Sequence, residues 1–132
     1  MFSSLRKYFF LVSLAGFLLT TVAAAALQNI TATDMQKSMK QTPGLYLLDV
    51  RTPGEYAQKH IKGAHLIPID QVQKRINEIP KDRSIIVYCE TGVRSTQVGR
   101  YLDRLGYNSV SNLSQGIMGW QLRGYPIESG MP

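Results

Sequence analysis

The sequence has few of the residues on which much of protein chemistry depends. Its 132 residues include one cysteine, Cys89, one tryptophan, Trp120, and two histidines, His60 and His65. A single cysteine excludes an internal disulfide, so the thiol is either free or paired with another molecule. No basic run with interleaved aromatic residues is present, and there is no repeat or low-complexity tract. We therefore expect no nucleic-acid partner.

The N-terminal segment has the features of an export signal. Arg6 and Lys7 precede an apolar run, and the run ends in four alanines, Ala23 to Ala26. This pattern predicts a signal peptide over residues 1–26, cleaved to give a periplasmic or secreted chain. The alternative is an uncleaved membrane anchor, because residues 9–27 hold 19 residues without a charge. Contact with a membrane is expected only in that case.

Residues 27–132 have the length of one domain. Once Arg6 and Lys7 are removed, 13 basic residues face 9 acidic ones, a net charge of +4. This balance suits small anionic ligands. We expect a monomer.

Helical and strand-like patterns alternate along this domain. The expected strands are short apolar runs at residues 45–50, 65–67, 84–89 and 109–113. The expected helices cover residues 31–39, 55–60, 95–105 and 115–122, and Asp70 is expected to cap one more, whose apolar face is Val72, Ile76 and Ile79. Such alternation predicts an α/β fold, an open and mostly parallel sheet flanked by helices on both faces.

Cys89 ends the most strand-like run, at the carboxyl end where parallel sheets place their ligand sites. Gly92 allows the backbone to turn inward, and a helix is expected to begin close behind it. Loop N–H groups and the helix N-terminus can then converge on the sulfur and favour its thiolate form, and Arg94 adds a planar donor for a leaving oxyanion. The alternative is a small buried hydrophobe without chemistry.

Three motifs in order resemble those of the rhodanese-like sulfurtransferases, in their small, single-domain, exported form. They are LLDVRTPGEYAQKHIKGAHLIPI from Leu47 to Ile69, IIVYCETGVRS from Ile85 to Ser95, and LSQGIMGWQLRGYPI from Leu113 to Ile127. Two positions depart from the family pattern. Gln115 replaces a glycine, and Glu90 places an acid beside the thiol.

The resemblance implies transfer of sulfane sulfur through a persulfide on Cys89, with no metal and no organic cofactor. Thiosulfate or a related small anion would donate the sulfur, and cyanide or a thiol would accept it. The implied substrate-binding residues form the loop after the cysteine, namely Glu90, Thr91, Gly92, Val93, Arg94 and Ser95.

Two other functions remain open at this stage. A phosphatase or arsenate reductase also uses a cysteine in an anion-binding loop, but such loops have five residues between Cys and Arg, and here only four separate Cys89 from Arg94. A non-catalytic carrier of sulfane sulfur is the second alternative. The sequence does not distinguish it from a slow enzyme.

The remaining polar residues have structural interpretations. We expect Asp49 and Arg51 to tie the strand end to Glu55 and to neighbouring loops. A Cys–His protease would need a base and an orienting group within hydrogen-bond range. His60 is instead expected to cap a turn, and Trp120 to belong to the core or a pocket wall.

Overall fold

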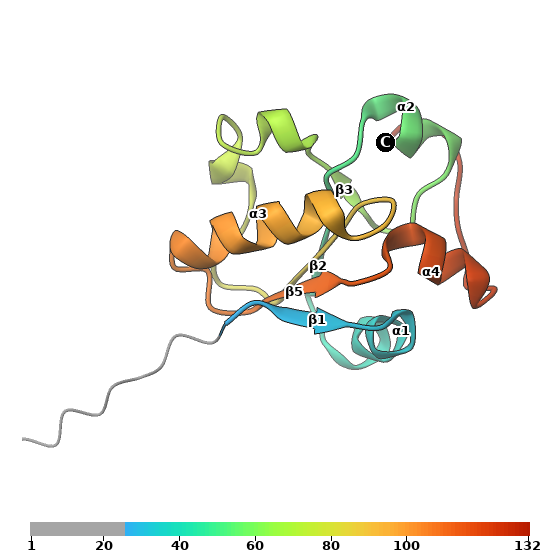
Figure 1. Cartoon of the computed structure of the whole chain (residues 1–132), viewed down its shortest axis with the longest axis horizontal. Coiled ribbons are helices and arrows are strands. Elements are labelled where there is room, and N and C mark those ends of the chain that lie inside the picture. Colours follow the sequence, from blue (N-terminus) through green and yellow to red (C-terminus); the bar gives the residue numbers. More distant parts are fainter. Residues whose placement is uncertain (1–25) are drawn as a thin grey trace, which may run out of the picture.

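The fold is centred on a five-stranded parallel sheet (Figure 1). A computed structural model describes residues 26–132, so nearly all of the expected signal segment lies outside the described residues. The strands are β1 (Gln28–Ile30), β2 (Tyr46–Asp49), β3 (His65–Leu66), β4 (Ile85–Tyr88) and β5 (Val110–Leu113), and their order in the sheet is β1-β5-β4-β2-β3. The predicted α/β fold is confirmed.

Helices cover both faces of the sheet, as expected. They are α1 (Ala32–Gln41), α2 (Pro53–Gln58), α3 (Val93–Arg104) and α4 (Gly116–Leu122). Side chains of α3 pack with Leu48 and Val87 in one core cluster. Side chains of α1, α2 and α4 pack with Leu47 and Ile86 in the other. Neighbouring residues of a strand point to opposite faces, so continuous apolar strands supply both cores.

Local sequence determines where the first two helices begin. Thr31 and Thr52 are the N-caps of α1 and α2, and each forms a capping box with the acid three residues on. Pro53 occupies the first helical position of α2, where its missing N–H has no cost. Each cap stabilises its helix by about 1 kcal/mol.

Two parts of the fold differ from the expectation. β1, at the edge of the sheet, was not predicted; it pairs with β5 through Gln28 to Ile30. The helix expected after Asp70 is wrong, because the chain forms two short 3-10 turns there, η1 (Ile69–Gln71) and η2 (Ile76–Glu78). Val72 and Ile79 still reach the core.

Within residues 26–132, no helix is long and apolar enough to cross a membrane.

Candidate active site

Cys89 lies at the carboxyl end of β4, the central strand of the sheet. The loop from Cys89 to Gly92 leads directly into α3 and runs beside the start of α4 (Figure 1). Only 1% of Cys89 is exposed. The thiol therefore lies where the sequence predicted a ligand site, at the carboxyl edge of a parallel sheet.

Hydrogen-bond donors surround the sulfur of Cys89. The backbone N–H groups of Gly92 and Ser95 donate to Sγ at 3.1 and 3.4 Å, and the Ser95 hydroxyl donates at 3.3 Å. Burial alone would raise the pKa of the thiol. The Ser95 hydroxyl and the N–H groups of Ser95, Gly92 and Thr91 outweigh that effect, so the pKa of Cys89 is lowered from 9.0.

The loop conformation requires a glycine at position 92. Gly92 has a φ of 97°, in the left-handed region, and precedes the first residue of α3. A Cβ added there would lie 2.3 Å from the carbonyl oxygen of Ser114, the residue directly after β5. Close approach and positive φ together exclude a side chain, which confirms the expected inward turn.

The start of α4 holds the other side of the loop. The N–H groups of Ile117 and Met118 donate to the carbonyl oxygens of Cys89 and Glu90 at 2.9 and 3.2 Å. Gly116 has a φ of 57°, and a Cβ there would lie 2.3 Å from the Glu90 oxygen. Gln115, where the family pattern has glycine, has a φ of −105° and needs no glycine.

A buried ion pair lies beneath the loop. Arg51 is 1% exposed and donates to both carboxylate oxygens of Asp49, and it also donates to the carbonyl oxygen of Lys59 at 2.7 Å. Its third partner is Glu90, at 3.2 Å. The expected tie to a neighbouring loop is confirmed, because Arg51 reaches both Lys59 and Glu90.

The expected tie of Asp49 and Arg51 to Glu55 is wrong. Both terminal nitrogens of Arg94 donate to the Glu55 carboxylate, at 2.9 and 2.8 Å. This pair, together with the cap contacts to Thr52 and against the opposing effect of burial, lowers the pKa of Glu55 to about 2. The Arg94 guanidinium is therefore held at the edge of α2, and its role toward a leaving oxyanion stays a prediction.

The other singled-out residues have structural contacts. His60 stacks on Tyr56 at 3.8 Å, its Nδ1 lies 3.0 Å from the Tyr56 carbonyl oxygen, and its Nε2 lies 3.7 Å from Glu128. His65 stacks on Tyr46. Trp120 is buried in the core and donates to the carbonyl oxygen of Pro126. These contacts agree with the interpretations given to His60 and Trp120.

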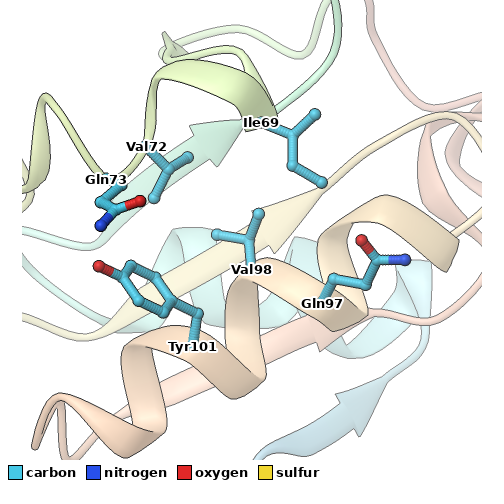
Figure 2. A pocket seen from close by; sticks show the side chains of 6 residues that line it. All are labelled: Ile69, Val72, Gln73, Gln97, Val98 and Tyr101. Carbon is cyan, nitrogen blue, oxygen red and sulfur yellow. The ribbon is translucent and has the colours of Figure 1, made fainter.

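A pocket lies away from the cysteine loop, between η1 and α3. Figure 2 shows that Val98 and Tyr101 of α3 face Ile69 and Val72 across it, and its volume is about 210 Å³. None of residues 89–95 lines it. Among the described residues, no cluster of His, Cys, Asp and Glu is arranged to hold a metal ion.

Sequence reasoning placed Ser95 in the loop but missed that its hydroxyl contacts the sulfur, and it missed the two α4 amides altogether. Ser95 follows the Cys-x4-Arg spacing directly, so its position in the first turn of α3 was a usable signal. The α4 amides have no such signal in the sequence, because every residue except proline carries a backbone N–H.

Residues 31–123 match the rhodanese-like domain family, and the chain therefore belongs to that family. It is 39% identical over 99 residues to a sulfurtransferase of Allochromatium vinosum, covering 75% of this chain and 92% of that protein. It is 30% identical over 84 residues to the thiosulfate sulfurtransferase GlpE of Tolumonas auensis, covering 64% and 79%.

A solved structure has the same fold. The crystal structure of a rhodanese-related protein from Thermoplasma volcanium superposes with a TM-score of 0.71 at 30% identity, covering 76% of this chain and 97% of that one. Some other relatives are longer, and the chain spans between 25% and 59% of four of them. The protein is a rhodanese-like domain protein with sulfurtransferases among its relatives.

Proposed function

We propose that this protein is a sulfurtransferase that carries sulfane sulfur on Cys89. The thiolate attacks the outer sulfur of thiosulfate or a related donor, the S–S bond of the donor breaks, and sulfite leaves with the electron pair. The persulfide anion on Cys89 then gives its outer sulfur to a thiol or to cyanide, which regenerates the thiolate.

The observation that carries the proposal is the convergence of donors on one sulfur atom. Gly92 N–H, Ser95 N–H and the Ser95 hydroxyl all donate to Sγ, and they favour the thiolate without a histidine base. Loop N–H groups of residues 90–95 would likewise stabilise the anionic persulfide. Because Cys89 is 1% exposed, a donor that presents one projecting sulfur atom suits the site.

The names of two relatives support the same chemistry. One is called a sulfurtransferase and the other a thiosulfate sulfurtransferase. The spacing of four residues between Cys89 and Arg94 disfavours phosphoryl or arsenyl chemistry, which needs a larger loop.

The test compares the wild type with Cys89→Ser. Thiosulfate should add one sulfur atom to the wild-type chain, seen by intact mass, and cyanide or a thiol should remove it with ping-pong kinetics. Cys89→Ser should lose both the mass gain and turnover while keeping the wild-type circular dichroism spectrum. Cys89-dependent release of phosphate from an aryl phosphate, without a persulfide, would refute the sulfurtransferase function.

A persulfide that forms but passes to no acceptor would assign the protein to the sulfur carriers instead.

We also propose that the chain is exported and that residues 1–26 are removed. The support is the sequence alone: Arg6 and Lys7, the apolar run, and the alanines up to Ala26. The intact mass of the protein from its native cells should correspond to a chain that begins between Ala26 and Gln28. A full-length chain that stays in the membrane after carbonate washing would support the anchor.

A further inference from the structure

The charged side chains around the cysteine loop compensate one another. Three of the cations near the loop are each paired with a carboxylate. The pairs are Arg51 with Asp49 at 2.7 Å and with Glu90 at 3.2 Å, Lys59 with Glu90 at 3.5 Å, and Arg94 with Glu55 at 2.8 Å. Three carboxylates thus balance these three cations.

Glu90 is the carboxylate with the greatest influence on this balance. It follows Cys89 directly, its side chain is 30% exposed, and it pairs with two of the three cations, Arg51 and Lys59. Asp49, by contrast, is fully buried beneath the loop. The Glu90 carboxylate therefore reaches solvent beside the cysteine loop while it neutralises Arg51 and Lys59.

This charge balance reduces attraction for doubly charged donors. Coulomb attraction is proportional to the charge of the ligand, so an uncompensated cation attracts a dianion twice as strongly as a monoanion. Compensation by Glu90 reduces that advantage, and a dianion such as thiosulfate loses more attraction than a monoanion does.

Apolar side chains also border the loop. Val93, at the start of α3, is 66% exposed, and Met118 of α4 is 47% exposed. The Met118 N–H donates to the Glu90 carbonyl oxygen, so Met118 lies directly beside the loop. Exposed apolar surface of this kind favours a ligand with an organic group.

We infer that Glu90 determines donor specificity and that the site selects a singly charged organic sulfane-sulfur donor over thiosulfate. The inference rests on the proposed function, because it concerns the donor of the same persulfide-forming step. With an organic thiosulfonate, the Cys89 thiolate attacks the terminal sulfur, the S–S bond breaks, and a sulfinate leaves with the electron pair.

The test uses three donors that react by one mechanism: thiosulfate, methanethiosulfonate and benzenethiosulfonate. The first is a dianion, and the others are monoanions that differ in apolar area. Replacing Glu90 by Gln should raise kcat/KM about 3-fold for methanethiosulfonate and about 10-fold for thiosulfate, because the effect on a dianion is the square of that on a monoanion. Both gains should shrink at about 1 M salt.

The ratio of the kcat/KM values for two donors separates the effect of Glu90 on the donor from any effect on the thiol. A change in the Cys89 thiolate acts on all three donors alike and cancels in the ratio. Glu78→Gln is the matched control, because it also removes one carboxylate from an ion pair. Glu78 pairs with Arg75, and its carbonyl accepts from Tyr46 at the opposite end of β2. This variant should leave all three kcat/KM values unchanged.

Two further variants keep the inference falsifiable if Glu90→Gln does not fold. Lys59→Met, at a partly exposed position, should lower kcat/KM for thiosulfate more than for methanethiosulfonate. Met118→Ser should lower the preference for benzenethiosulfonate over methanethiosulfonate about 3-fold.

Equal fold-changes for the dianion and the monoanion, in both charge variants, would overturn the role of Glu90 in donor choice. An unchanged preference in Met118→Ser would overturn selection for the organic group. Failure of every donor to form a persulfide would instead refute the proposed function.

Discussion

Replacing Ser95 by Ala removes one of the donors that lower the pKa of Cys89. The Ser95 hydroxyl lies 3.3 Å from Sγ, and Ser95 is fully buried, so no solvent replaces it. A hydrogen bond to a charged group contributes about 1.5–3 kcal/mol, and one pKa unit corresponds to about 1.4 kcal/mol. We therefore expect the pKa of Cys89 to rise, and the thiolate-to-thiol ratio at a given pH to fall about 10-fold.

The assay is the rate of alkylation of Cys89 by iodoacetamide as a function of pH. At a pH below both pKa values the rate should fall about 10-fold in Ser95→Ala, and the plateau at high pH should change little. Ser109→Ala is the control, because it removes an exposed hydroxyl that contacts Ser84 before β5 begins. Superimposable pH profiles for wild type and a folded Ser95→Ala would refute the role of the hydroxyl.

Stability should follow the same titration. The pKa of Cys89 is depressed in the folded state, so the thiolate adds stability above the ordinary value of 9.0, and that stability is lost as the pH falls through the folded value. Ser95→Ala should narrow the pH range between the folded pKa and 9.0 over which this stability is gained, as measured by urea unfolding at several pH values.

Three more predictions follow from the ion pair and the glycine beside the loop. Glu55 has a pKa of about 2 in the folded chain against an ordinary value of 4.5, so its ion pair stabilises the fold fully above about pH 4.5, and this stabilisation is lost as the pH falls toward 2. Glu55→Gln should lower the free energy of unfolding by about 1 kcal/mol at neutral pH, after solvent screening. Near pH 2, urea unfolding should show no difference between the variant and the wild type. Arg94→Ala should slow persulfide formation from thiosulfate by ~10²-fold or more, with a loss of stability within about 1 kcal/mol. Unchanged kinetics would show that the backbone amides of the loop are sufficient for the reaction without Arg94. Gly116→Ala, at a φ of 57°, places a Cβ 2.3 Å from the carbonyl oxygen of Glu90 and should destabilise the fold by about 2–4 kcal/mol. Gly54→Ala is the control, because no atom lies within 4 Å of the added Cβ, and it should change stability by less than about 1 kcal/mol. Thermal unfolding measures both variants. Equal stability of the two glycine variants would contradict the close contact.

The sequence was sufficient for the elements whose signals are local. The four apolar strands appear near their expected positions because continuous apolar runs have one stable environment, the centre of a covered sheet. The signals that start α1 and α2 are local as well, because the capping boxes at Thr31 and Thr52 are each complete within four residues. The position of Cys89 at the end of β4 followed from the same reasoning.

The parts that were missed depend on distant residues. β1 is three residues long and mostly exposed, so only its pairing with β5 makes it a strand. The spacing of Val72, Ile76 and Ile79 indicates which side chains reach the core, and two 3-10 turns satisfy it as well as an α-helix does.

The charge partners were missed for a similar reason. Arg51 pairs with Glu90, and Glu55 with Arg94, across 39 positions in each case. No local pattern specifies which of several acids a long basic side chain will contact.

The attachment of the cysteine loop to α4 has a consequence for the order of events during synthesis. The carbonyl groups of Cys89 and Glu90 are held by Ile117 and Met118, which leave the ribosome almost thirty residues after the cysteine. Until those amides are in place, the loop N–H groups are not fixed around Sγ, and the thiol keeps an ordinary acidity. The nascent chain therefore carries a cysteine of ordinary acidity, and we expect its pKa to fall when the last helix docks.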